Sequence, residues 1–180
     1  MESFNENRAV GCLSELIALE CGYDHSKARQ IRNAAVLHDI GKQQIDKSIL
    51  DKPGKLNSQE FEIIKTHTKL GVELMASFRG ELSDVAKIIA LFHHEWHNPA
   101  LGGYWNVSSY YLPDYVSFVS ISDVYMSLIS KRPYKDAWRR QDALDYIENQ
   151  SGTQFCPELV KLFTSLIGHD SRVPEFLSAE

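Results

Sequence analysis

The sequence predicts an all-α fold, a compact bundle of helices. Apolar residues recur at three- and four-residue spacing over most of the chain, which is the pattern of helices with one buried face. Signals for helix starts, such as Asp24 and the segment from Asn57 to Glu60, precede several of these stretches. No segment with the two-residue period of a strand stands out. At 180 residues, the chain suits one domain with a substantial core.

The first half of the chain is predicted to contain four helices. Gly22 ends the first of them, and residues 41–56 form an ordered loop with a turn at Pro53-Gly54. The predicted helices run from near Asn5 to Gly22, from Asp24 to His38-Asp39, from the capping box at Asn57 toward Met75, and from near Ser83 through Phe92 into His93-His94-Glu95.

The second half begins with an irregular segment, residues 96–112. Pro113 suits the first position of the helix that follows, which runs through Met126. The segment from Arg132 to Lys135 is a break. Two more helices are expected, from Ala137 to Glu148 and from Pro157 through Phe163, before a polar tail that begins at Gly168.

Composition excludes several classes of function. The formal net charge is −5, so the chain lacks the broad positive surface that grips a nucleic acid polymer. The 3 cysteines form no CxxC pair, so neither a disulfide framework nor a zinc ribbon is predicted. We expect a cytoplasmic protein without a membrane partner, because no signal peptide is visible and no apolar run approaches the roughly 20 residues that span a bilayer.

Imidazole and carboxylate side chains recur on core faces or at ends of four predicted helices. A buried ionisable group is costly unless it is paired or binds a metal, and Asp123 lies among apolar residues with no adjacent cation. Any one of these side chains has an ordinary explanation, but the set favours a shared metal site. Such nitrogen and oxygen ligands suit Zn, Fe and Mn. The candidate ligands are His38, Asp39, His67, His93, His94 and Asp123.

The adjacent His38 and Asp39 are the centre of this prediction. They follow an apolar helical run, so both side chains are expected to point from a helix end into a shared cavity. Lys42 follows closely and supplies a positive charge of the kind that neutralises a phosphate oxygen.

At these residues the sequence resembles the HD-GYP subfamily of the HD-domain metal-dependent phosphohydrolases. The segment from Leu37 to Lys42 matches the HDxGK core, and the segment from His93 to Glu95 matches the HHE motif. The likeness covers nearly the whole chain, residues 1–180, as a single domain, either complete or a fragment of a longer protein. The other matching segments are Leu50 to Leu56, His67 with Gly71, Gly103-Tyr104, Ser122 to Tyr125, Arg132 to Lys135 and Gly152 to Phe155.

The resemblance implies a compact helical bundle that hydrolyses cyclic di-GMP or a related cyclic dinucleotide. It implies two or three divalent metal ions, Fe or Mn above all, held by the candidate ligands. Asp39 is the natural bridge between two ions, because a carboxylate has two oxygens. Lys42 would contact the scissile phosphate, and Arg132 would help to hold ligand or loop. An upstream sensor domain or a protein partner fits the same resemblance.

The irregular segment between residues 96 and 112 is rich in aromatic residues. A long loop in a compact domain is usually functional or disordered, and this one is too aromatic for disorder. Two interpretations stay open: the rings stack on guanine, with Tyr104 as the candidate substrate-binding residue, or they only pack the loop onto the bundle. The aromatic residues are Trp96, Tyr104, Trp105, Tyr110 and Tyr111.

The chain departs from the family pattern in three places. Where the first helix of the family donates a histidine, either Glu6 or Asn5 stands, depending on the alignment, and Glu6 could ligate a metal through oxygen. The loop after the HHE motif has two extra residues and carries Trp105 in place of the motif's proline. Cys156 replaces an aspartate, which we expect to matter little for chemistry.

Two rival functions follow from these departures. The fold could serve as a ligand-sensing or protein-docking module with weak or no turnover. Alternatively, the chemistry is kept and the substrate is another nucleotide or phosphoester. The six internal ligands favour metal binding under all three functions.

Overall fold

The structure, a computed structural model, describes residues 2–131 and 136–169. Within these ranges the chain is all-helical, as predicted, with only an isolated bridge between Ser151 and Phe155 and no named strand. None of its helices there combines the length and apolarity needed to cross a membrane. The elements are α1 (Glu2–Glu20), α2 (His25–Ala35), η1 (Ile40–Gln44), α3 (Lys47–Leu50), α4 (Ser58–Lys65), α5 (His67–Leu74), α6 (Glu81–Phe92), η2 (Ser109–Tyr111), α7 (Asp114–Ile129), α8 (Arg140–Asn149) and α9 (Pro157–His169).

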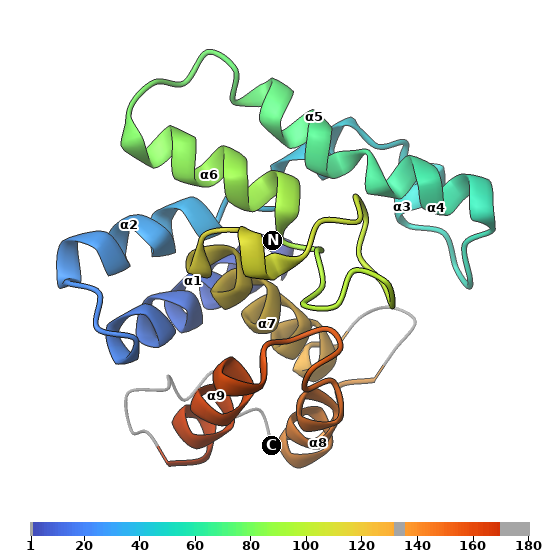
Figure 1. Ribbon diagram of the computed structural model, residues 1–180. Coiled ribbons are helices and arrows are strands. Elements are labelled where there is room, and N and C mark those ends of the chain that lie inside the picture. Colours follow the sequence, from blue (N-terminus) through green and yellow to red (C-terminus); the bar gives the residue numbers. More distant parts are fainter. Residues whose placement is uncertain (1, 132–135, 170–180) are drawn as a thin grey trace.

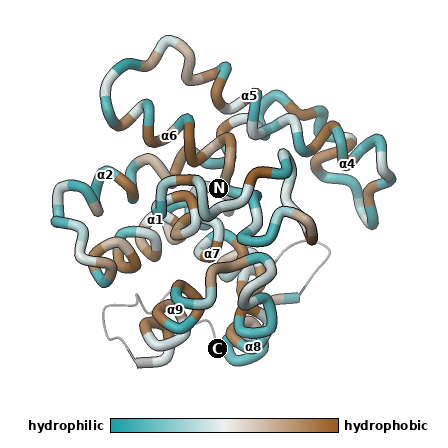
Figure 2. The backbone as a smooth tube through the Cα atoms, viewed as in Figure 1, coloured by the Kyte–Doolittle hydropathy of each residue, from teal (hydrophilic) through white to brown (hydrophobic). Residues whose placement is uncertain are grey.

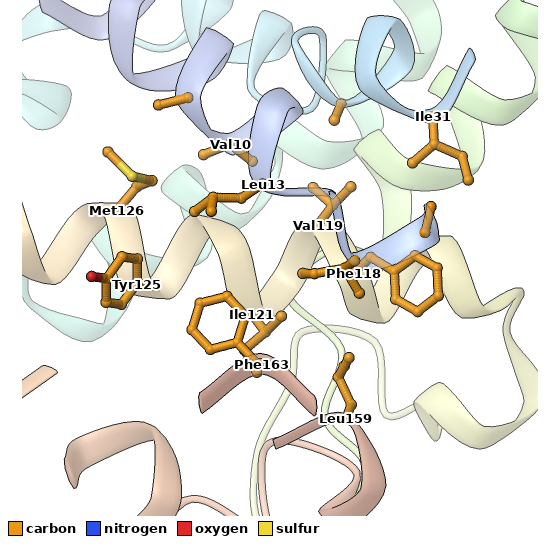
Figure 3. Close-up of a cluster of buried hydrophobic side chains, with 14 of the residues drawn as sticks. Val10, Leu13, Ile31, Phe118, Val119, Ile121, Tyr125, Met126, Leu159 and Phe163 are labelled. Carbon is orange, nitrogen blue, oxygen red and sulfur yellow. The ribbon is translucent and has the colours of Figure 1, made fainter. Parts of the chain in front are cut away.

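Helix α7 is the centre of the bundle. Figure 1 shows it between α1 and α2 on one side and α8 and α9 on the other. Leu13 of α1, Ile121 of α7 and Phe163 of α9 belong to one cluster of buried apolar side chains (Figure 3). The peripheral helices alternate between hydrophobic and hydrophilic stretches (Figure 2), as expected for helices that bury one face. The core therefore packs around α7 and fixes the position of this helix. Asp123, which lies on α7, is fixed along with it.

The predicted helix starts are confirmed at two positions. The Asp24 carboxylate accepts a hydrogen bond from the Lys27 backbone N–H at 2.8 Å and caps α2. Asn57 and Glu60 form the full capping box of α4, in which each side chain accepts a hydrogen bond from the other residue's backbone N–H. These caps satisfy N–H groups that the first turn of a helix leaves without partners.

Two predicted boundaries were wrong around the segment that follows η1. Residues 41–56 are not a plain loop. The Asp46 side chain accepts a hydrogen bond from the Ser48 backbone N–H and caps the single turn of α3. The expected helix from Asn57 to Met75 is two helices. Thr66 stands between them with helical backbone angles, but its N–H donates to the Ile63 carbonyl oxygen, three residues back, at 3.1 Å, and α5 begins at the next residue.

Smaller differences concern helix ends. Helix α1 begins at Glu2, three residues before the predicted start. Pro113 precedes α7 as its cap, with extended backbone, and is not its first helical residue. Helix α8 begins at Arg140 and not at Ala137, whereas α9 begins at Pro157 as predicted and continues to His169, into the segment expected to be a tail. Residues 132–135 and 170–180 lie outside the described ranges.

A close backbone crossing brings η1 against α5. A β-carbon at position 41 would overlap the carbonyl oxygen of His67 and lie 2.5 Å from the backbone nitrogen of Gly71. Only glycine fits here, because the atoms that a side chain would meet belong to backbone. Gly41 thus sets the distance between His38-Asp39 and His67.

Gly41→Ala should destabilise the protein and disturb the site together. Overpacking of this kind costs about 2 kcal/mol or more, which at roughly 2–4 °C per kcal/mol lowers the melting temperature by about 4–8 °C. Gly168→Ala is the matched control, because a β-carbon at that position of α9 meets nothing within 4 Å. Thermal unfolding of both variants checks this; equal melting temperatures would contradict the assigned role of the crossing.

Candidate metal centre

Helix ends bring the predicted ligands together. His38 lies in the turn after α2, Asp39 precedes η1, and His67 is the first residue of α5. His93 and His94 follow the end of α6, and Asp123 comes from the interior of α7. Their donor atoms form two groups in which all atoms lie within 4.8 Å of one another: Asp39 with His67, His93 and His94, and His38 with His93 and Asp123.

Backbone hydrogen bonds fix the orientation of three imidazoles. The Nδ1 atoms of His38 and His67 each lie 2.7 Å from the carbonyl oxygen three residues earlier, and Nδ1 of His93 lies 3.1 Å from the Ile89 oxygen. A carbonyl oxygen can only accept, so Nδ1 carries the proton in each ring. In the neutral form of each ring the lone pair is then on Nε2, and the Nε2 atoms of His38 and His67 each lie in a donor group that also contains His93. This is the second layer of contacts that orients histidine ligands in metal sites.

The Asp39 carboxylate lies between the two groups. Its Oδ1 is 3.2 Å from Nε2 of His67 and 3.7 Å from Nε2 of His93. Its Oδ2 is 3.4 Å from Nε2 of His38 and 2.5 Å from Nζ of Lys42. One oxygen therefore faces each group, which is the arrangement expected of a bridging carboxylate.

Charges in the cluster are strongly coupled. Burial alone would lower the pKa of His38, but the carboxylates of Asp39 and Asp123 outweigh it and raise this pKa to about 10. Burial would raise the pKa of Asp39, yet the charges of His38 and Lys42 hold it well below its ordinary value. Asp123, whose Oδ1 lies 3.5 Å from Nε2 of His38, likewise keeps a lowered pKa against the effect of burial. The two carboxylates thus attract positive charge at this point.

Two further histidines of the cluster, His93 and His94, favour the neutral form. Burial, followed by the nearby His94, holds the pKa of His93 well below its ordinary value. Burial lowers the pKa of His94 to about 4. Neutral imidazoles beside ionised carboxylates are the protonation states that metal ligands need.

Several buried donor atoms of the cluster lack hydrogen-bond partners, which bears on whether the cluster fits a metal ion. In the described part of the chain, Nε2 of His38, His67 and His93 and Oδ1 of Asp39 are buried and have no hydrogen-bond partner. Leaving polar atoms in this state is costly, and native proteins rarely do so without a water or an ion. Each of these atoms belongs to one or both of the two donor groups, so the donor sets fit divalent cations.

One predicted site residue, Glu6, stands apart from this cluster. Glu6 is half-buried on α1 but belongs to neither group of donor atoms. Near it, the Asn7 side chain donates a hydrogen bond at 3.3 Å to the Val36 carbonyl oxygen at the end of α2. Arg132, predicted to hold ligand or loop, lies outside the described residues.

The aromatic loop reaches the cluster through Tyr104. Its ring stacks on His94, with centroids 4.3 Å apart and an angle of 28° between the planes. Burial, helped by Asp39 and Asp123, raises the pKa of Tyr104, so the phenol stays protonated. Sequence reasoning missed the role of Glu95, which accepts hydrogen bonds from the backbone N–H groups of this loop. Its only sequence signal was membership of the HHE motif.

The fold and this cluster define a helical domain built around a histidine–aspartate cluster that could hold metal ions. The model of the HD domain family matches residues 7–137, and the chain belongs to that family. The resemblance to its HD-GYP subfamily, predicted from the motifs, is confirmed by the relatives and solved structures that the chain matches.

Three relatives illustrate the similarity. The 3'3'-cGAMP-specific phosphodiesterase 2 of Vibrio cholerae is 38% identical over 165 residues, which cover 87% of this chain and 31% of the relative. The cyclic di-GMP phosphodiesterase response regulator RpfG of Xanthomonas campestris is 38% identical over 146 residues, 81% of this chain and 38% of the relative. A cyclic di-GMP phosphodiesterase of Thermotoga maritima is 35% identical over 173 residues, 92% of this chain and 45% of the relative. The chain spans less than half the length of each.

Two solved structures share the fold. An HDG"Y"P protein from Bdellovibrio bacteriovorus gives a TM-score of 0.71 at 16% identity, covering 93% of this chain and 53% of that one. A cyclic GMP-AMP specific phosphodiesterase from V. cholerae gives a TM-score of 0.67 at 14% identity, covering 97% of this chain and 46% of that one. At such identity the similarity concerns the fold.

His67→Ala should remove bound metal, because it deletes one of the converging Nε2 atoms. The exposed His25 at the start of α2 is in neither donor group, so His25→Ala is the control. Metal analysis of the purified proteins should show at least a twofold loss in the first variant and none in the second. Full metal content in His67→Ala would count against the cluster as a metal centre.

Removing the metal should also destabilise the unaltered protein. A ligand held at a hundredfold excess over its Kd stabilises the folded state by about 2.7 kcal/mol, and at roughly 2–4 °C per kcal/mol its loss lowers the melting temperature by about 5–10 °C. Thermal scans of metal-loaded protein with and without a chelator measure this. The His67→Ala protein should respond little, and an equal response would contradict the prediction.

Proposed function

We propose that this domain is a metal-dependent phosphodiesterase that hydrolyses a cyclic dinucleotide, either cyclic di-GMP or 3'3'-cGAMP. The observation that carries the proposal is the convergence of unsatisfied Nε2 and carboxylate atoms beside a lysine. The relatives that match most of this chain bear the names of phosphodiesterases for these two substrates. Those names divide between the two substrates at similar identity, and turnover of each substrate distinguishes them.

The donor sets support a two-ion site, with Fe or Mn as the ions. His67, His94 and one oxygen of Asp39 would hold one ion; His38, Asp123 and the other oxygen of Asp39 would hold the second, and His93 is close to both groups. When bound, such ions lower the pKa of water and neutralise charge on a phosphoryl group. A third ion at Glu6 has no support from the donor groups.

Lys42 is the protein's own cation for the phosphate. Its Nζ is paired with Oδ2 of Asp39, so it is held at the edge of the cluster, and its side chain is 35% exposed. A phosphate that enters the site can exchange places with the Asp39 oxygen as the partner of this ammonium group. Lys42 would then stabilise the extra negative charge that develops during cleavage.

Tyr104 supplies a surface for a nucleobase. Its ring covers His94 on one side and meets Phe61 edge-on, with centroids 5.8 Å apart. Lys65 Nζ lies 5.9 Å from the Tyr104 centroid, so positive charge adjoins the aromatic surface. A flat base next to a phosphate matches this combination.

Turnover of defined substrates tests the proposal. Protein loaded separately with Fe and Mn is incubated with cyclic di-GMP and with 3'3'-cGAMP, and the linear dinucleotide or mononucleotide products are measured. Products from either substrate support the proposal. Saturable binding without product would favour the sensing or docking module, and cleavage of only unrelated phosphoesters would favour the other rival function.

Lys42→Met should reduce kcat far more than metal content. Loss of one preorganised donor to a developing charge typically costs about 10²–10³-fold in kcat. The exposed Lys55, in the turn before α4, provides the control variant Lys55→Met, which should keep full activity. Steady-state kinetics and metal analysis are made on the same samples. A parallel loss of metal and activity in Lys42→Met would show that Lys42 serves the metal site instead of the phosphate.

A further inference from the structure

Glu95 is a buried carboxylate that the proposed chemistry does not use. It directly follows His93-His94 and is only 2% exposed. In the described part of the chain its hydrogen-bond partners are three backbone N–H groups. Those of Tyr104 and Trp105 donate to Oε1 at 3.0 and 2.8 Å, and that of Val107 donates to Oε2 at 2.9 Å. Such charge-assisted hydrogen bonds are about twice as strong as neutral ones.

The loop is bent so that these N–H groups surround the carboxylate. Gly103 has φ 101 and Asn106 has φ 61, both in the left-handed region. A β-carbon at position 103 would lie 3.1 Å from Oε2 of Glu95, so glycine also leaves room for the carboxylate. We call this arrangement of Glu95 with residues 103–107 the clasp.

The clasp places Tyr104 relative to the metal cluster. Glu95 is covalently next to His94, and the loop that it binds carries the ring that stacks on His94. A second tether comes from Trp105, whose indole N–H donates to the Thr68 hydroxyl at 3.2 Å and whose ring lies 3.6 Å below Lys69 Nζ. The loop is therefore fastened both to the end of α6 and to α5.

Trp105 contributes a backbone hydrogen bond to the clasp that proline could not make. Its backbone N–H makes the shortest of the three hydrogen bonds to Glu95, and proline has no N–H to donate. Trp105, which stands in place of the motif's proline, thus contributes a hydrogen bond that proline could not make.

We propose that Glu95 is a positioning residue. Through the clasp it holds the Tyr104 ring in a fixed position beside the metal cluster, where the base of the substrate packs against this ring. The identity of that substrate as a cyclic dinucleotide rests on the proposed function. The clasp acts on binding and orientation, so its loss should weaken substrate affinity while the ligands and Lys42 keep their places.

Glu95→Gln is the sharpest variant, because it keeps the size of the side chain. One of the two oxygens becomes an NH₂ group. At least one of the three backbone N–H groups then faces a hydrogen-bond donor in place of an acceptor, and its hydrogen bond is lost. Amide hydrogen exchange of residues 103–107 should become about 10-fold faster. The KM for the cyclic dinucleotide should rise about 10-fold, with kcat and metal content within about twofold of the unaltered protein. Glu73→Gln, on an exposed position of α5, is the matched control and should change none of these.

Unchanged exchange in this loop, or a fall in kcat in proportion to metal content, would overturn the proposal. If Glu95→Gln does not fold, Trp105→Pro and Trp105→Phe decide it, since only phenylalanine keeps the backbone N–H. Proline should speed exchange in the loop and raise KM more than phenylalanine does; equal effects would refute the clasp. Absence of turnover in the unaltered protein would refute the proposed function, while the exchange rates would still decide whether Glu95 fastens the loop.

Discussion

The structure depends on three ring nitrogens and one carboxylate oxygen, from His38, His67, His93 and Asp39, that are buried near one another without hydrogen-bond partners in the described residues. Such a group opposes folding unless positive charge joins it. The chain reduces this cost by taking most of the ligands from helix ends. There the Nδ1–H groups of His38, His67 and His93 find carbonyl oxygens of the preceding turn, so each ring leaves only Nε2 unsatisfied.

Placing ligands at helix ends requires close contacts between helices. Gly41 allows η1 to touch the backbone of α5, and Gly11 allows α1 to approach the Arg32 carbonyl oxygen of α2, where a β-carbon would lie 2.8 Å away. One turn before Gly11, Asn7 donates to the Val36 oxygen, one of the carbonyls that the end of α2 leaves without a helical partner. The first helix therefore contributes packing and a helix-end hydrogen bond beside His38-Asp39, whatever the role of Glu6.

Most of the fold and the cluster could be predicted from the sequence, because helical periodicity and ligand type are local properties. Asp24, Asn57 and Glu60 identify helix starts within four residues of chain, and Asp123 is conspicuous by its apolar neighbours. The division at Thr66 could not be predicted, since a single tighter turn between α4 and α5 leaves no mark in the spacing of apolar residues. The function of Glu95 was hidden for a similar reason: its partners lie 9 to 12 residues further along an irregular loop, whose path no periodicity encodes.

The same loop is also held at its beginning, by a distant part of the chain. The backbone N–H groups of His97 and Asn98 donate to the carbonyl oxygens of Gln154 and Thr153, in the turn between α8 and α9. This gives the segment from Gly152 to Phe155, noted in the sequence only as a motif, a structural purpose. Chemistry and recognition are thereby supported separately: helix ends around α7 hold the ligands, whereas Glu95 and the α8–α9 turn hold the loop. The two supports meet at the adjacent residues His94 and Glu95 and again at the start of α5, where Thr68, next to His67, accepts the Trp105 indole N–H.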